Sequence, residues 1–185
     1  MDNKRRQIIL GAVGASVIPT RGAACGDRTR RQTAGPFFRP DSPLRTRIVD
    51  DKTPGISMLL QGRVLDANCE PLAGTSLDFW QADERGTYDN RGYPLRGHQF
   101  SDEAGNYHLE TIKPGSYGDQ RFRRTPHIHV RLITPTRQLL TTQLYFPDEH
   151  DLNQSDVLFE PSLLVELKTG DEPTTAYFDF ILAVE

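Results

Sequence analysis

The chain has 185 residues, which suits a single domain with one hydrophobic core and leaves no room for two. Its 22 Lys and Arg against 25 Asp and Glu give a formal net charge of −3, without a basic stripe along the sequence. This balance argues against nucleic acid as a partner, and the only dense basic spot is the run RFRR at 121–124.

Residues 1–24 are predicted to form an export leader. A basic start, NKRRQ, is followed by the apolar run IILGAVGASVI and by small residues just before Cys25. The apolar run is too short to span a bilayer as a stable helix. The pair Arg5-Arg6 ahead of it resembles a twin-arginine signal, which exports proteins that have already folded around a cofactor. We therefore expect an exported protein, periplasmic or extracellular, and the alternative is an uncleaved cytoplasmic N-terminus.

Cys25 has two possible roles. It follows Ala23 and Ala24, as a lipid-attachment cysteine does, although Gly22 stands where an aliphatic residue is usual. In an oxidising compartment Cys25 could instead pair with Cys69, the only other cysteine in the sequence. Contact with a membrane is expected only if Cys25 is lipidated.

The rest of the chain is predicted to be an extended arm, 25–56, followed by an all-β domain, 57–185. The arm is rich in Pro, Arg and Asp. Beyond it, short runs of strand character alternate with dense turn signals, and no window keeps a helical period beyond about two turns. This spacing predicts an antiparallel β-sandwich. The expected strands are 58–65, 75–81, 106–112, 127–134, 139–146, 163–168 and 176–184.

His127 and His129 flank Ile128 in the strand-like run HIHVRLIT. Because side chains alternate along a strand, both imidazoles lie on one face, about 6 to 7 Å apart, while Ile128 points the other way into a core. Two such rings are half of a metal site. The sequence has 2 cysteines and no C-x-x-C motif, so the remaining ligands are expected to be oxygens of Asp, Glu or Tyr.

The tyrosines fall into two groups. Tyr88 and Tyr117 lie in polar turns, as does Tyr93, and an aromatic ring in such a turn needs a reason other than packing. The plain alternative is a ring lying on the surface. Phenolate is a hard donor that favours Fe(III) over Zn(II) or Cu(I). The remaining tyrosines lie in strand runs, where core packing explains them: Tyr107, Tyr145 and Tyr177.

Carboxylates offer a competing metal site. The non-haem Fe(II) triad of two histidines and one carboxylate usually begins H-x-D or H-x-E, which HIH does not. A cupin-like site needs a Glu shortly after HIH and a later His. The following segment VRLITPT has no Glu, although His150 could be the later His. The residues alone leave these possibilities open.

Segments spread over much of the chain follow a known family pattern, in order and with matching spacing. They are TAGPFF from Thr33, DANCEPLAGTSLDFWQADERGTYD, LRGHQFSDEAGNY, TIKPGSYG, RRTPHIHV and LTTQLYF, which ends at Phe146. The chain therefore resembles the intradiol ring-cleaving dioxygenases, the family of catechol 1,2-dioxygenase and protocatechuate 3,4-dioxygenase. It looks most like the exported single-domain members, because the N-terminal helical dimerisation domain of catechol 1,2-dioxygenases has no room here.

The resemblance implies a non-haem Fe(III) centre. The family's two tyrosine ligands fall on Tyr88 and Tyr117, and its two histidine ligands fall on His127 and His129. A hydroxide would be the fifth ligand. Tyr117, the axial ligand by this likeness, would act as a base that accepts a substrate proton and leaves the metal.

Two further residues are implied to flank the substrate. Arg124 would stabilise negative charge on the reacting ring, and Gln143 would position an oxygen atom. Without the resemblance, Arg124 reads as a solvated arginine and Gln143 as an ordinary polar strand residue. The chain also departs from the family: Thr125 stands where Pro is common, Phe37-Phe38 stand where a tyrosine is frequent, and no Trp follows Tyr117.

The implied activity is cleavage of a catechol by O₂ to a cis,cis-muconate. The alternative is a non-catalytic transthyretin-like β-sandwich module that binds proteins or sugars, because GRVLDANCEPLAG also suits such a module. The sequence leaves the oligomeric state and the particular catechol open. Protocatechuate would need a cation for its carboxylate, and the candidates are Arg39, Arg91, Arg96 and Arg121.

Overall fold

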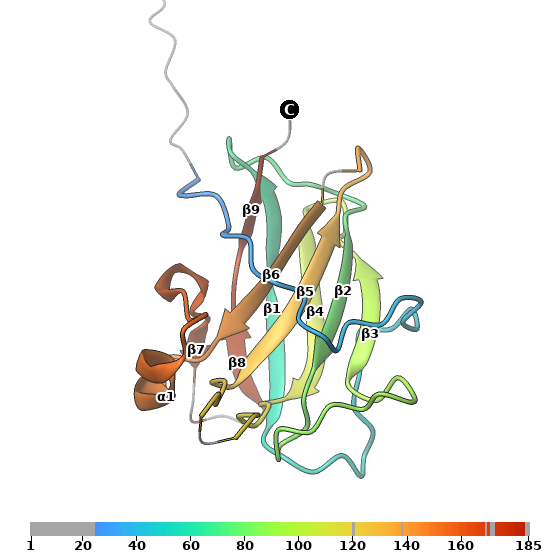
Figure 1. The fold of residues 1–185 in the computed structure, drawn as a ribbon. Coiled ribbons are helices and arrows are strands. Elements are labelled where there is room, and N and C mark those ends of the chain that lie inside the picture. Colours follow the sequence, from blue (N-terminus) through green and yellow to red (C-terminus); the bar gives the residue numbers. More distant parts are fainter. Residues whose placement is uncertain (1–24, 120, 138, 169, 171–172, 184–185) are drawn as a thin grey trace, which may run out of the picture.

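The computed structural model describes residues 25–119, 121–137, 139–168, 170 and 173–183 (Figure 1). The leader predicted over residues 1–24 lies outside the described residues. The elements are β1 (Ser57–Asp66), β2 (Ser76–Gln81), β3 (Arg96–Phe100), β4 (Asn106–Ile112), β5 (His127–Ile133), β6 (Leu139–Tyr145), α1 (His150–Ser155), η1 (Pro161–Leu163), β7 (Glu166–Lys168), β8 (Thr174–Tyr177) and β9 (Phe180–Leu182).

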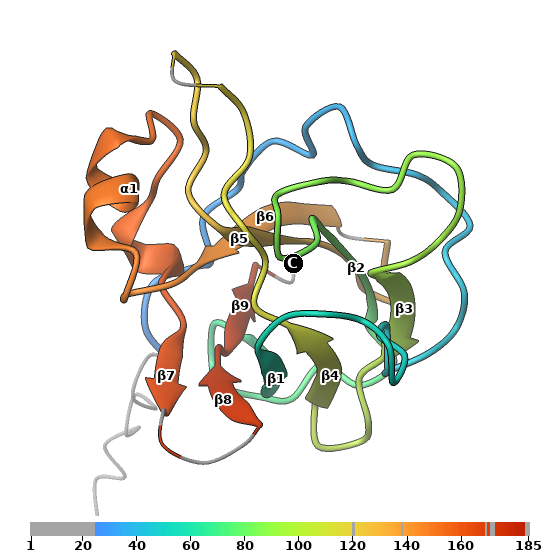
Figure 2. The same cartoon turned by 90° about the horizontal axis from the view of Figure 1, so that it is seen from below.

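The strands form two sheets packed face to face, so the predicted β-sandwich is confirmed. One sheet has the order β4-β1-β8-β7, with β9 also paired to β1, and the other has the order β3-β2-β5-β6. Seen along the strands, the sheets form two separate layers (Figure 2). Most neighbours are antiparallel, as predicted, but β1 pairs with β8 and β9 in parallel. The C-terminal strands therefore return in the same direction as the first strand.

Strand β5 shows how the alternation of side chains builds the site. Ile128, Val130 and Leu132 have no exposed surface and face the core between the sheets. Burial of each such side chain stabilises the fold by roughly 1.5–3 kcal/mol. His127 and His129 point to the opposite face, yet they are only 2% and 1% exposed. The outer face of β5 must therefore be covered by other segments.

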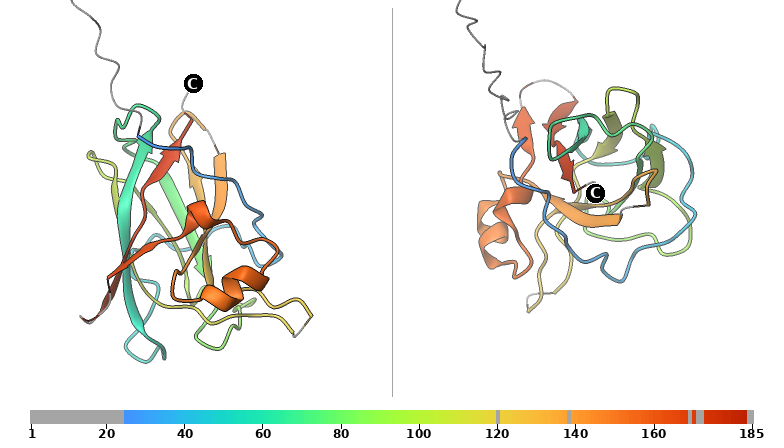
Figure 3. Two further views of the ribbon diagram at one scale, coloured as in Figure 1. Left: turned by 90° about the vertical axis from the view of Figure 1, so that its left-hand side faces the viewer. Right: turned by 90° about the horizontal axis from the view of Figure 1, so that it is seen from above.

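The N-terminal arm supplies part of this cover. It has no regular strand and crosses β6 and β5 on their outer side (Figure 1). Its backbone bonds to the β6 strand through Gln32, whose N–H donates to the Thr141 carbonyl at 2.8 Å. The arm then continues along the sandwich above α1 (Figure 3). An extended arm laid over the domain was predicted from its composition, and the structure confirms it.

Cys25 and Cys69 form a disulfide. This bond joins the start of the arm to the turn after β1 and confirms one of the two roles expected for Cys25. A sulfur held in a disulfide has no free valence for a lipid thioether. Among the helices in the described part of the chain, none has the length and apolar character needed to cross a membrane.

The secondary structure differs from the prediction in several places. The prediction missed β3 and α1, and the strand expected at 163–168 is preceded by η1 and shortened to β7. The strand expected at 176–184 is divided into β8 and β9. Asp179 lies between them and accepts the backbone N–H of Arg63 at 2.8 Å, which interrupts the ladder to β1.

Candidate metal centre and active site

His127 and His129 bring two nitrogen atoms to one point. The Nδ1 of His127 donates to the Thr125 carbonyl at 2.6 Å, so its Nε2 carries a lone pair. The two Nε2 atoms lie 3.2 Å apart. Burial lowers the pKa of His127 to about 4 and that of His129 well below the ordinary value. Both rings are therefore neutral at neutral pH, which is the form that binds metals.

The His129 ring is held by stacking. Trp80 of β2 lies parallel to it, with the ring centroids 4.8 Å apart and an interplanar angle of 4°. The Nδ1 atom of His129 is buried and has no hydrogen-bond partner among the described residues. Without a metal, the Nε2–H of His129 can donate to the lone pair of His127 at 3.2 Å, whereas a cation bound at the His129 Nε2 would place the ring proton on Nδ1.

Tyr88 and Tyr117 approach the histidines from two turns that lie against each other. The closest approach is at Gly86, where a Cβ atom would overlap the carbonyl oxygen of Ser116, and at Gly115, where it would overlap that of Glu84. Only glycine permits two turns to lie this close.

The phenol groups consequently reach the histidine pair. The hydroxyl of Tyr88 lies 3.5 Å from the Nε2 of His127. The Tyr117 ring lies edge to face with that of Tyr88, with centroids 5.4 Å apart, and 5.6 Å from the His127 ring. Burial raises the pKa of Tyr88, so the free phenol is neutral at neutral pH. A strong Lewis acid is needed to make it a phenolate ligand.

Phe37 of the arm covers both tyrosines. Its ring stacks on Tyr88 at 4.2 Å between centroids and meets Tyr117 edge-on at 5.7 Å. The buried Arg96 holds this layer in place, since it donates to the Phe37 carbonyl at 2.7 Å and to the Asp89 carbonyl at 2.9 Å. A surface ring was one expectation for Tyr88, and it is wrong, because Tyr88 is only 7% exposed.

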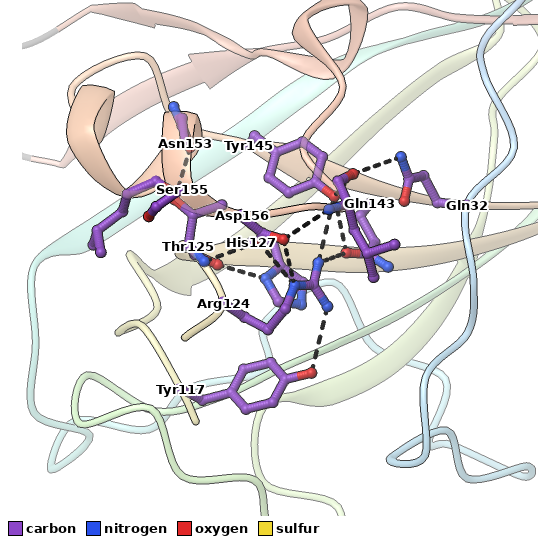
Figure 4. Close-up of polar contacts among 12 residues, drawn as sticks. Gln32, Tyr117, Arg124, Thr125, His127, Gln143, Tyr145, Asn153, Ser155 and Asp156 are labelled. Carbon is purple, nitrogen blue, oxygen red and sulfur yellow. Dashed lines mark hydrogen bonds and ion pairs between the residues drawn. The ribbon is translucent and has the colours of Figure 1, made fainter. Parts of the chain in front are cut away.

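Arg124 and Gln143 lie beside two of the four donor residues, Tyr117 and His127 (Figure 4). One terminal nitrogen of Arg124, Nη1, is 3.4 Å from the Tyr117 hydroxyl, and the other, Nη2, donates to the Oε1 of Gln143 at 2.6 Å. The Nε2 of Gln143 donates to the Thr33 carbonyl of the arm at 2.9 Å. The Arg124 side chain is 12% exposed, so it is not the solvated arginine that RFRR alone suggests.

Comparison with known proteins decides the family. Residues 34–182 match the family model described as Dioxygenase. The chain belongs to the intradiol ring-cleavage dioxygenases. It is 32% identical over 173 residues to catechol 1,2-dioxygenase of Candida albicans, covering 78% of this chain and 57% of that protein. The chain thus spans little more than half the length of this relative.

Two further relatives of this dioxygenase are similar over most of the domain. The alpha chain of protocatechuate 3,4-dioxygenase of Pseudomonas putida is 31% identical, covering 68% of this chain and 72% of that one. The solved dioxygenase domain of a dioxygenase carbohydrate-binding protein fusion from Streptomyces sp. SirexAA-E is 46% identical. Its TM-score is 0.80, and the match covers 86% of this chain and all of that chain.

The donor set of this chain fits an iron(III) ion. Two neutral imidazoles and two phenols converge, and phenolate oxygen is a hard donor suited to Fe(III). The competing sites lack their ligands: within the described residues, no group of three His, Cys, Asp or Glu side chains could hold a metal. His150, the late histidine of a cupin-like site, lies on α1 with its side chain 74% exposed.

Sequence reasoning missed two residues of the site. Tyr145 was expected to pack in the core, but its hydroxyl lies 3.1 Å from the Oε1 of Gln143 and 2.9 Å from the Leu158 carbonyl. Asp156 was not considered, although its carboxylate is fully buried against Arg124. The one sequence signal for Tyr145 is its spacing, since it follows Gln143 by two residues and so shares its face of β6.

Proposed function

We propose that this chain is a non-haem Fe(III) intradiol dioxygenase that cleaves a catechol between its two hydroxyl-bearing carbons. The observation that carries the proposal is the convergence of two histidine Nε2 atoms and two tyrosines beside a buried arginine. The carbon–carbon bond breaks, both atoms of O₂ enter the product, and a cis,cis-muconate with two carboxylates results. The reaction balances without an added reductant.

The proposed iron ligands are Tyr88, Tyr117, His127 and His129. Bound Fe(III) would chelate both catechol oxygens and make the ring reactive toward O₂. The two tyrosines differ in their surroundings, because Tyr88 is buried beneath Phe37 whereas Tyr117 is only partly buried. Tyr117 is therefore the ligand with room to move, and we assign it as the base that takes a proton from the substrate.

Arg124 has the position to act on the substrate without being a metal ligand. Its Nη1 lies beside the Tyr117 hydroxyl. When Tyr117 moves away, a substrate ring that takes the position of this hydroxyl would lie next to Nη1. A fixed guanidinium there would stabilise negative charge that develops on the ring. Gln143 is held by Arg124 on one side and by the arm on the other, so its amide is oriented before the substrate arrives.

The substrate class proposed here is the catechols. Among the four arginines considered for a substrate carboxylate, Arg96 is unsuitable because its terminal nitrogens are bound to the Phe37 and Asp89 carbonyls. The proposed location is outside the cytoplasm, which the predicted leader and the disulfide support.

The test combines metal analysis, colour and oxygen uptake on the purified protein. One iron per chain, a broad visible absorption band from phenolate-to-iron charge transfer and uptake of O₂ with catechol or protocatechuate are expected. Mass spectrometry after reaction in ¹⁸O₂ should find both labelled atoms in a muconate. A yellow semialdehyde would mean extradiol cleavage, and colourless protein with stoichiometric iron would refute the tyrosine ligands. Colourless, iron-free protein without oxygen uptake would favour the binding-module alternative.

A further inference from the structure

The turn that follows α1 carries a buried carboxylate directed at Arg124. Asp156 is the C-cap residue of this helix, and its side chain has no exposed surface. Both of its oxygens lie within hydrogen-bond distance of the Arg124 Nε, at 3.0 and 2.8 Å (Figure 4). Burial alone would lower the pKa of Arg124, but the hydrogen bond and charge of Asp156 outweigh it and raise the pKa.

Asp156 and the active-site residues bind different nitrogens of the Arg124 guanidinium. Asp156 binds only the Nε side of Arg124, so the two terminal nitrogens remain directed at Tyr117 and Gln143. A carboxylate bound to a terminal nitrogen would instead turn the two terminal nitrogens away from the substrate position. The arrangement therefore fixes the rotation of the guanidinium about the end of its side chain.

The other two contacts of Asp156 accept backbone N–H groups, one on each oxygen, and a neutral amide in its place could keep the first of them. Its Oδ1 accepts the N–H of Leu158 at 2.9 Å, which is an Asx turn, and its Oδ2 accepts the N–H of Thr125 at 3.0 Å. Asn or Ser makes an Asx-type turn as well as Asp does. A negative charge at the C-terminal end of a helix is unfavourable, and a buried carboxylate is costly without a cation. Arg124 is the cation that accounts for the charge.

The same turn also borders the Gln143 side of the site. The Leu158 carbonyl accepts the Tyr145 hydroxyl at 2.9 Å, and that hydroxyl lies 3.1 Å from the Gln143 Oε1. The Leu158 carbonyl also accepts the Nε2 of Gln32 in the arm at 3.0 Å. The turn thus contacts the arm, the Gln143 side of the site and Arg124 together.

We propose that Asp156 is a positioning residue that acts through Arg124, and that the turn after α1 is the support of this catalytic arginine. The inference rests on the proposed function, in which Arg124 acts on the bound catechol. It makes α1, a short helix absent from the sequence-based prediction, part of the active-site apparatus.

The experiment compares Asp156→Asn with Asn153→Ala. Asn153 is buried in the same segment and binds the Thr125 side chain and the Phe146 carbonyl, without contact to Arg124. Asp156→Asn should lower kcat about 10- to 100-fold, the range typical when the partner of an active-site group is lost. Catechol binding, followed by the shift of the visible band, and iron content should change little. Asn153→Ala should lower the melting temperature by a similar amount but keep most of kcat.

A double variant separates a direct role of Asp156 from one exerted through Arg124. In the Arg124→Leu background, Asp156→Asn should cause no further loss of kcat, because the residue it positions is gone. A further loss of tenfold or more in that background would overturn the proposal. So would an Asn153→Ala variant that loses as much kcat as Asp156→Asn, because the effect would then be general destabilisation.

A readout independent of turnover distinguishes failure of this inference from failure of the proposed function. In the metal-free protein, the Arg124 Nε–H resonance should be slow to exchange with solvent and should shift or disappear in Asp156→Asn. If the wild type does not cleave catechols, the proposed function fails, and this resonance still decides whether Asp156 fixes Arg124. An Nε–H resonance unchanged by Asp156→Asn would refute the positioning role, whatever the activity.

Discussion

The Nε2 atoms of His127 and His129 face each other 3.2 Å apart, with both rings buried. The hydrogen bond from His127 to Thr125 directs a lone pair of His127 into this space, so nothing but a proton or a cation can lie favourably between the rings. The pair is therefore arranged for a metal and is poorly arranged for simple packing.

The metal-free protein should lose stability as the pH falls from about 6.5 to about 4. Burial depresses the pKa of His127 to about 4, so below its ordinary value of 6.5 the unfolded chain takes up a proton that the folded chain does not. The free energy of unfolding then falls with pH, by roughly 3 kcal/mol for this residue over the whole window. Urea unfolding at several pH values measures the slope. His127→Asn should reduce the slope, and the part that remains should come from His129, whose pKa burial also lowers.

The two tyrosines should differ when each is replaced by phenylalanine. Tyr117→Phe should keep some iron and colour but bind catechols poorly, because the base that leaves the metal is missing. Tyr88→Phe should lose or shift the charge-transfer band even with substrate bound. Optical titration with catechol measures both effects. Identical behaviour of the two variants with substrate bound would leave the division of roles unsupported.

Arg124→Leu should separate substrate binding from turnover. It removes a fixed positive charge beside the reacting ring without removing a ligand, so iron content, colour and the substrate-induced band shift should survive. Turnover should fall about 10²-fold or more, the scale for loss of one preorganised electrostatic group. Arg123→Leu is the matched control, because Arg123 is exposed and, within the described part of the chain, its side chain bonds only to that of Ser116. Unchanged turnover in Arg124→Leu would mean that this arginine has no role in the reaction.

Gly86→Ala should disturb the position of Tyr117, although Gly86 is not itself a ligand. A Cβ at Gly86 would overlap the backbone of the turn that carries Tyr117, and φ at this residue is +81°. Gly74→Ala has a similar φ of +67° but a Cβ there meets only Pro135 at 3.6 Å, so it reports the backbone strain alone. Strain of this kind costs about 1–2 kcal/mol. Gly86→Ala should be less stable than Gly74→Ala in thermal melts and should also bind less iron. Equal iron content in the two variants would show that the turns do not need this close contact.

The sequence predicted best what local pattern determines. Alternation along a strand placed His127 and His129 on one face, and turn chemistry separated the strands. Local sequence pattern could not show that Tyr88 is buried. The ring that covers it belongs to Phe37, which lies in the arm, far from Tyr88 in sequence. Asp156 escaped prediction for the same reason: its carboxylate forms an ordinary turn locally, and only the folded chain brings it to Arg124. Strand β3 was missed because its sequence, RGHQF, has no β-branched residue and no alternation of apolar and polar side chains.

The bond between Cys25 and Cys69 closes a covalent ring that contains the whole arm. A protease that cuts once between these cysteines, for instance at Arg39 or Arg47, would open the ring without releasing either piece. The nicked protein would migrate as two fragments only after reduction. The segment that carries Phe37 would thus stay tethered to the sandwich at one end or the other after such a cut. In the location outside the cytoplasm proposed above, where proteases can cut exposed segments, this linkage would keep the segment that covers the site attached after a cut in the arm.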